Sequence, residues 1–83
     1  MEQGSLRHVL MTFHDPYSPP DVGWHDRAKM TELKPAVCKI SGWLLAENED
    51  SYIVASTINE EVNDVSMLTC LPRGCVVEIK DVT

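Results

Sequence analysis

The residues best suited to chemistry are gathered in one proline-rich segment, residues 14–26 (HDPYSPPDVGWHD). It contains two histidines, three aspartates, three prolines, one tyrosine and one tryptophan. Loops of this length in compact domains are usually functional or disordered, and prolines lower the entropy cost of ordering one. Two interpretations stay open for Tyr17 and Trp24: they fold back as lids on the core, or they form a ligand-binding loop or subunit contact. In the second case we expect Tyr17, Trp24 and His25 to be binding residues, because exposed aromatic side chains are typical of interface hot spots.

Zinc is the metal that the side chains of this chain would favour. Donors of the right type are His8, His14, His25, Asp15, Asp26 and the three cysteines. Their spacing does not favour a site, because Cys70 and Cys75 form C-x4-C with no second matching pair. Burial of small side chains beside a turn explains these two cysteines better. We therefore expect neither a bound metal nor a cofactor.

Catalytic motifs are also missing from the sequence. A cysteine nucleophile needs a partly exposed thiolate, whereas Cys38, Cys70 and Cys75 all fall within strand patterns. No P-loop, dinucleotide fingerprint or nucleophile elbow occurs. The sequence therefore predicts a protein that is not an enzyme.

Arg73 is the remaining candidate for binding. It stands between Pro72, which presets φ for a turn, and Gly74, which can supply a positive φ. Turn geometry leaves only the arginine unexplained, either as a solvated side chain or as a phosphate or carboxylate ligand. The second possibility supports an alternative function, the sequestration of small anionic ligands such as signalling nucleotides, by Arg73 or by the set Lys29, Lys34 and Lys39.

Composition narrows the class of protein. The 83 residues include only five aromatic ones, which predicts one domain with a thin core of Val, Ile and Leu. The net charge of −6 lies in the second half, since residues 41–83 carry eight acidic and two basic side chains. An acidic chain is repelled by phosphate backbones, so we expect no duplex nucleic acid as a partner. The apolar runs are too short to span a bilayer, and an odd number of cysteines fits a reducing compartment; both favour the cytoplasm and no membrane partner.

Period-2 patterns predict five strands and one short helix. The expected strands cover residues 6–13, 36–46, 51–58, 66–71 and 75–82, and the expected helix covers residues 26–33. Asp26 would cap this helix, and Met30 and Leu33 would have to pack on the sheet to hold so short a segment. Gly42 marks a bulge or sharp bend. In the last strand, Cys75, Val77 and Ile79 are expected to share an apolar face.

These elements predict an all-β fold. The five strands, the long first connection and the tight last one indicate a small, partly open, strongly curved barrel of the Sm-like or Src-homology type, with one short helix after the first strand. The whole chain, residues 1–83, forms the domain, and residues 1–5 are expected to be flexible.

Several segments together resemble a family of short, functionally uncharacterised bacteriophage and prophage proteins. They are Gly23-Trp24, residues 38–45 (CKISGWLL) with the acidic turn that follows, residues 53–56 (IVAS) and residues 71–75 (LPRGC). The resemblance implies a small barrel and provides no catalytic residues. It implies an accessory interaction module in the host cytoplasm, whose partner is a host protein, a further copy of itself or a signalling nucleotide. The thin core, the aromatic loop and the lack of catalytic motifs favour self-association into a homo-oligomer, a dimer or a larger ring.

Overall fold

The structure, a computed structural model, describes residues 6–20 and 22–82. Residues 1–5, which were expected to be flexible, and Asp21 lie outside these ranges. The elements are β1 (Arg7–Asp15), α1 (Arg27–Met30), β2 (Ala36–Glu47), β3 (Ser51–Asn59), β4 (Asp64–Pro72), the 3-10 turn η1 (Arg73–Cys75) and β5 (Val76–Asp81). The predicted strands are therefore all present: β1, β2 and β3 are one residue longer than expected, β4 is three residues longer and β5 is two residues shorter.

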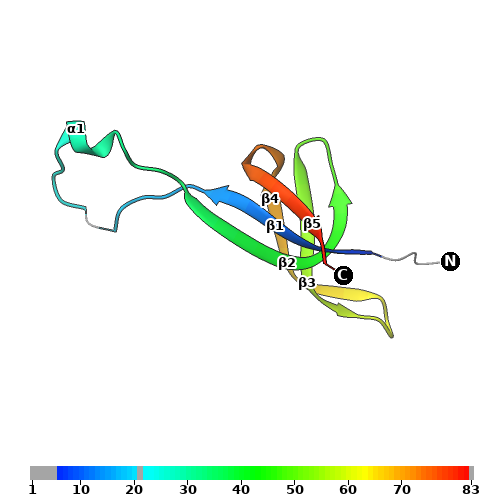
Figure 1. Ribbon diagram of the computed structural model, residues 1–83. Coiled ribbons are helices and arrows are strands. Elements are labelled where there is room, and N and C mark those ends of the chain that lie inside the picture. Colours follow the sequence, from blue (N-terminus) through cyan, green and yellow to red (C-terminus); the bar gives the residue numbers. More distant parts are fainter. Residues whose placement is uncertain (1–5, 21, 83) are drawn as a thin grey trace.

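The strands form one antiparallel sheet in the order β4-β3-β2-β1-β5 (Figure 1). This confirms the predicted small all-β class. The sheet curves strongly but does not close, so β4 and β5 are its two edges within the described ranges. Edge strands present backbone N–H and C=O groups that a further strand can pair with.

The core lies on one face of the curved sheet. Its buried side chains include Val9, Met11, Leu44, Val54 and Leu71, and partly buried residues such as Phe13 pack against them. Val9, Met11 and Phe13 alternate along β1, as the period-2 pattern predicted. Because one face of a single sheet supplies nearly all of this core, the number of fully buried residues stays small.

Gly42 lies in β2 at a position where the backbone of β3 is very close. A Cβ atom at this position would be 2.4 Å from the carbonyl oxygen of Ala55 and 2.8 Å from Cγ1 of Val54. Only a glycine fits so close an approach. The register of β2 against β3 shifts between Leu44 and Ala46, so the bulge itself is at Leu45, three residues after the glycine.

A second bulge alters the predicted face of β5. Thr12 of β1 is opposite Glu78, but Phe13 is opposite Val76, which leaves Val77 without a partner in the ladder. Such a bulge interrupts the alternation of side chains. The prediction that Val77 shares the apolar face of Ile79 is therefore wrong: Val77 is 56% exposed, and Val76 packs on the core with Ile79 instead.

The connection between β4 and β5 also differs from its prediction in one respect. Pro72 has the expected φ of −57° and precedes η1. Gly74, however, has no left-handed φ, and a Cβ atom there would meet nothing within 4 Å. Among the non-glycine residues that the structure describes, those with a positive φ are Asn63, in the β3–β4 turn, and Met67, within β4.

Candidate interaction site

A long arm joins β1 to β2 and extends away from the sheet, with α1 at its far end (Figure 1). Tyr17 is 50% exposed, and Val22 and Trp24 are fully exposed. The interpretation of Tyr17 and Trp24 as lids on the core is therefore wrong. The arm presents aromatic and aliphatic side chains to solvent, as an interaction loop does.

Local hydrogen bonds form the single turn of α1. Oδ1 of Asp26 accepts a hydrogen bond from the Ala28 amide at 2.9 Å, which confirms the predicted N-cap. The hydroxyl of Thr31 donates to the Ala28 carbonyl at 2.8 Å at the other end. Leu33 is 47% exposed and no residue of α1 is buried, so the prediction that Met30 and Leu33 pack on the sheet is wrong. The contacts described for α1 are therefore local hydrogen bonds and not burial against the sheet.

The four predicted binding residues do not form one site. Tyr17, Trp24 and His25 belong to the arm, whereas Arg73 lies in η1 against β3. The Arg73 guanidinium donates a hydrogen bond to the Tyr52 hydroxyl at 2.6 Å and lies over the Tyr52 ring, 4.6 Å from its centroid. Its backbone N–H donates to the Asp50 carbonyl at 2.8 Å. Arg73 therefore fastens η1 to the neighbouring hairpin.

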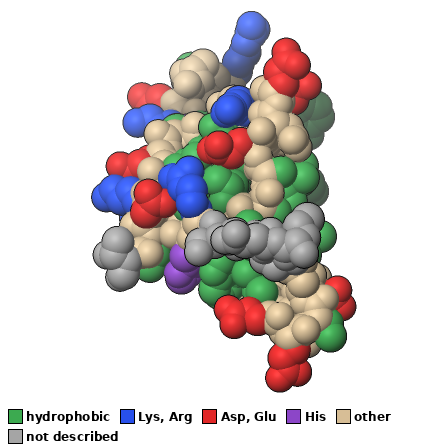
Figure 2. All heavy atoms as spheres, turned by 90° about the vertical axis from the view of Figure 1, so that its right-hand side faces the viewer, with side chains coloured by type: hydrophobic (Ala, Val, Ile, Leu, Met, Phe, Trp, Pro, Cys, Tyr) green, Lys and Arg blue, Asp and Glu red, His purple; other side chains and the backbone are tan. Residues whose placement is uncertain are grey.

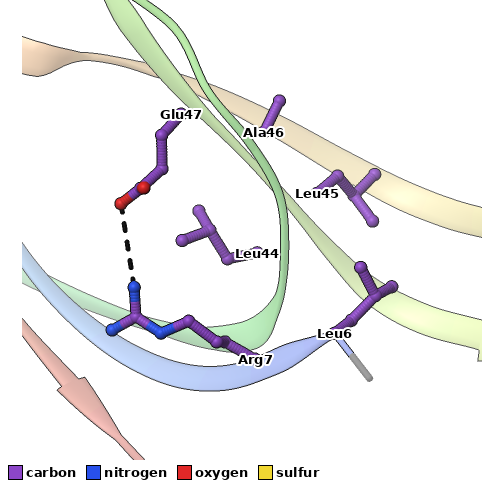
Figure 3. Close-up of a pocket in the computed structure, with 6 residues that line it drawn as sticks. All are labelled: Leu6, Arg7, Leu44, Leu45, Ala46 and Glu47. Carbon is purple, nitrogen blue, oxygen red and sulfur yellow. Dashed lines mark ion pairs between the residues drawn. The ribbon is translucent and has the colours of Figure 1, made fainter. Parts of the chain in front are cut away.

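Arg7 lines the pocket of Figure 3, a shallow cavity of about 270 Å³ between the start of β1 and the end of β2. Its Nε atom donates to Oδ1 of Asp81 at 2.8 Å, and its Nη1 atom is 3.7 Å from Oε1 of Glu47. The hydrogen bond and charge of Asp81 raise the pKa of Arg7 above its usual value. Because two carboxylates already neutralise this guanidinium, the pocket offers an anion no uncompensated positive charge. This group was not predicted from the sequence, since Arg7 and Asp81 are 74 residues apart.

The edge strand β4 exposes several hydrophobic side chains. Met67 is 70% exposed, and Val65 and Leu68 are exposed as well. These hydrophobic side chains on an edge strand are available to a partner. Their exposure was not predicted from the sequence.

The surface beside β4 is acidic at the β3–β4 turn. Figure 1 places this turn, in yellow, on the side of the molecule opposite the arm. Figure 2 views that side and shows acidic and hydrophobic side chains next to one another in its lower part. The acidic residues of the turn and its flanks are Glu60, Glu61 and Asp64, with the exposed Val62 among them.

The cysteines are free thiols, and their burial is lower than predicted. Cys70 is exposed, whereas Cys38 and Cys75 are half-buried, so burial does not explain Cys70. No group of three or more metal-binding side chains occurs among residues 6–20 and 22–82. No helix in the same ranges has the length and apolar character needed to cross a membrane.

Comparison of the chain with protein-family models, curated proteins and solved structures gives no match.

Proposed function

We propose that this chain is a non-enzymatic interaction module that associates with further copies of itself. The observation that carries the proposal is the fully exposed Trp24 on an arm whose described side chains do not belong to the buried core. Tryptophan is among the residues that dominate binding energy at protein interfaces. An arm that presents it to water gains stability when a partner covers it.

The small core supports the same proposal. Only six hydrophobic side chains are buried in the described part of the chain. Domains of this size are marginally stable, and oligomerisation is one common way to add buried surface. The open edges at β4 and β5 supply further surface for association.

The finer fold and the origin of the protein belong to the proposal as well. A long first connection and a 3-10 turn between the last two strands are features of the Sm-like and Src-homology-type barrels, which favours that assignment for this sheet. We further propose that the protein is a phage-type accessory factor that acts in the host cytoplasm. This rests on the resemblance described for the sequence.

The alternative, a binder of small anionic ligands, has less support. Arg73 is held by Tyr52. Lys29 and Lys34 lie on the arm, while Lys39 lies in β2, so these cations come from different parts of the molecule. A thermal-shift screen against cyclic and linear nucleotides tests this alternative, because ligand at about 100 times its dissociation constant adds about 2.7 kcal/mol of stability.

Size-exclusion chromatography with light scattering tests self-association. We expect a mass above the 9.3 kDa of one chain at high micromolar concentration. Trp24→Ala should raise the dissociation constant at least about tenfold, which corresponds to 1.4 kcal/mol. It should leave the melting temperature of the dissociated monomer unchanged, because Trp24 does not contact the core. Trp24→Phe keeps an aromatic ring and is the matched control.

A strict monomer at high micromolar concentration contradicts self-association. A large loss of monomer stability in Trp24→Ala would instead show that the tryptophan packs on the core.

A further inference from the structure

The β3–β4 turn and the strand that follows it form a surface that combines exposed hydrophobic side chains with negative charge. We call it the hairpin surface. It consists of Glu60, Glu61, Val62, Asp64, Val65 and Met67. Its three carboxylates and the absence of basic residues from positions 59–67 give it a charge of −3.

The arm offers the opposite combination. Val22, Trp24 and Leu33 are exposed on it. Within residues 22–34 the basic side chains are Arg27, Lys29 and Lys34, against the acidic Asp26 and Glu32. This part of the arm, which we call the arm surface, therefore carries a charge of +1 next to exposed hydrophobic side chains, and the Asp26 carboxylate is engaged in capping α1.

The two surfaces lie at opposite ends of an elongated molecule. Figure 1 shows α1 on the left and the β3–β4 turn, in yellow, at the lower right, and the longest dimension of the molecule is 59 Å. One protomer in this conformation cannot bring its own surfaces together. When two complementary surfaces lie at opposite ends of one chain, the first surface of one copy binds the second surface of another copy. Such a contact joins two different surfaces and is called heterologous.

We propose that the arm surface of one protomer docks on the hairpin surface of another. This inference rests on the proposed self-association and names the surfaces that produce it. The occupant of the hairpin surface is a second copy of this chain, because the arm matches it in both charge and hydrophobic character. Apolar contact supplies affinity, and the opposite charges set the orientation and exclude arm-to-arm and hairpin-to-hairpin pairing.

Charge reversal on each surface tests the pairing. One variant is Glu60→Lys with Glu61→Lys, and the other is Arg27→Glu with Lys29→Glu. All four side chains are exposed, so both variants should fold, which circular dichroism checks. Each variant has two surfaces of like charge, and we expect its dissociation constant to rise at least about tenfold, or 1.4 kcal/mol.

Mixing the two variants distinguishes docking from a general effect of charge. In an equimolar mixture, the basic arm of the first variant meets the acidic hairpin of the second, and the reversed surfaces also match. We therefore expect the mixture to recover an affinity close to that of the natural chain. Salt should weaken the association of the natural chain, because exposed charges are screened.

The control is Glu49→Lys with Asp50→Lys at the β2–β3 turn. Each replacement changes the charge by two units, so the two together shift the net charge of the control from −6 to −2. The hairpin variant has the same net charge. We expect the control to associate like the natural chain. The inference is overturned if the control is weakened as much as the hairpin variant, if the mixture stays dissociated, or if either reversal has no effect. A natural chain that remains monomeric overturns the proposed function itself, whereas an oligomer insensitive to these reversals overturns only the docking inference.

Discussion

Replacement of Gly42 by alanine tests the close approach of β2 and β3. The added Cβ atom would lie 2.4 Å from the Ala55 carbonyl oxygen and 2.8 Å from a methyl group of Val54. Real contacts of this kind are not shorter than 3.0 Å, so the two backbones must separate by about 0.6 Å, the difference between 3.0 and 2.4. The oxygen is a backbone atom of a paired strand and cannot turn aside as a flexible side chain can.

The cost follows from the packing around this position. Val54 is fully buried and belongs to the core. Overpacking a well-packed core costs about 1–3 kcal/mol, and the presence of a backbone contact places Gly42→Ala in the upper part of this range. A loss of about 2.5 kcal/mol corresponds to a fall of roughly 10–20 °C in melting temperature for a domain of this size.

Urea unfolding followed by circular dichroism at low micromolar concentration measures this effect without a contribution from association. Gly74→Ala is the matched control, since its Cβ would contact nothing and its φ is not left-handed. We expect it to be neutral or to stabilise the protein by up to about 1 kcal/mol, because alanine restricts the unfolded chain. The reasoning is refuted if Gly42→Ala unfolds at the same urea concentration as the natural chain.

Three further replacements test local features of the structure. Met67 has a φ of 57° within β4. We expect Met67→Gly to raise the free energy of unfolding of the monomer by about 0.5–1 kcal/mol, since the strain of about 1–2 kcal/mol at a left-handed residue exceeds the entropy cost of a glycine. A lower free energy of unfolding in urea would contradict this. Tyr52→Phe removes the acceptor of the 2.6 Å hydrogen bond from Arg73 but keeps the ring beneath the guanidinium, so it should cost about 0.5 kcal/mol, and Arg73→Ala should cost more in the same assay. Asp26→Ala removes the N-cap of α1 and should unfold this helical turn, seen in the NMR chemical shifts of residues 27–30, while the melting temperature of the sheet stays unchanged; a common loss of both would show that α1 packs on the sheet.

The strands were predictable because their signals are local. Val9, Met11 and Phe13 alternate along β1, and the structure places all three on the core side. The bulge at Val77 was not predictable, because it arises from the register that β5 adopts against β1, and one shifted residue reverses the faces of the positions beyond it.

The candidate site was predictable in part. The composition of residues 14–26 singled out Tyr17 and Trp24, but it could not decide between a lid and an exposed arm, since that depends on the path of the chain in space. The expectation that Met30 and Leu33 need the sheet underestimated capping by Asp26. Arg73 was correctly placed beside a turn. Its contact with Tyr52 could not be predicted, because the two residues are 21 positions apart and no local pattern in the sequence indicates their pairing.

The position of β1 in the sheet has a consequence for synthesis on the ribosome. β1 lies between β2 and β5, so one of its two hydrogen-bonding edges has no partner strand until residues 76–81 have left the exit tunnel. Pairing of Val9 with Asp81 closes a loop of more than 70 residues, and non-local pairings of this kind slow folding. The sheet is therefore completed after translation of its last strand. Until then the nascent chain exposes the backbone edge of β1 that later pairs with β5.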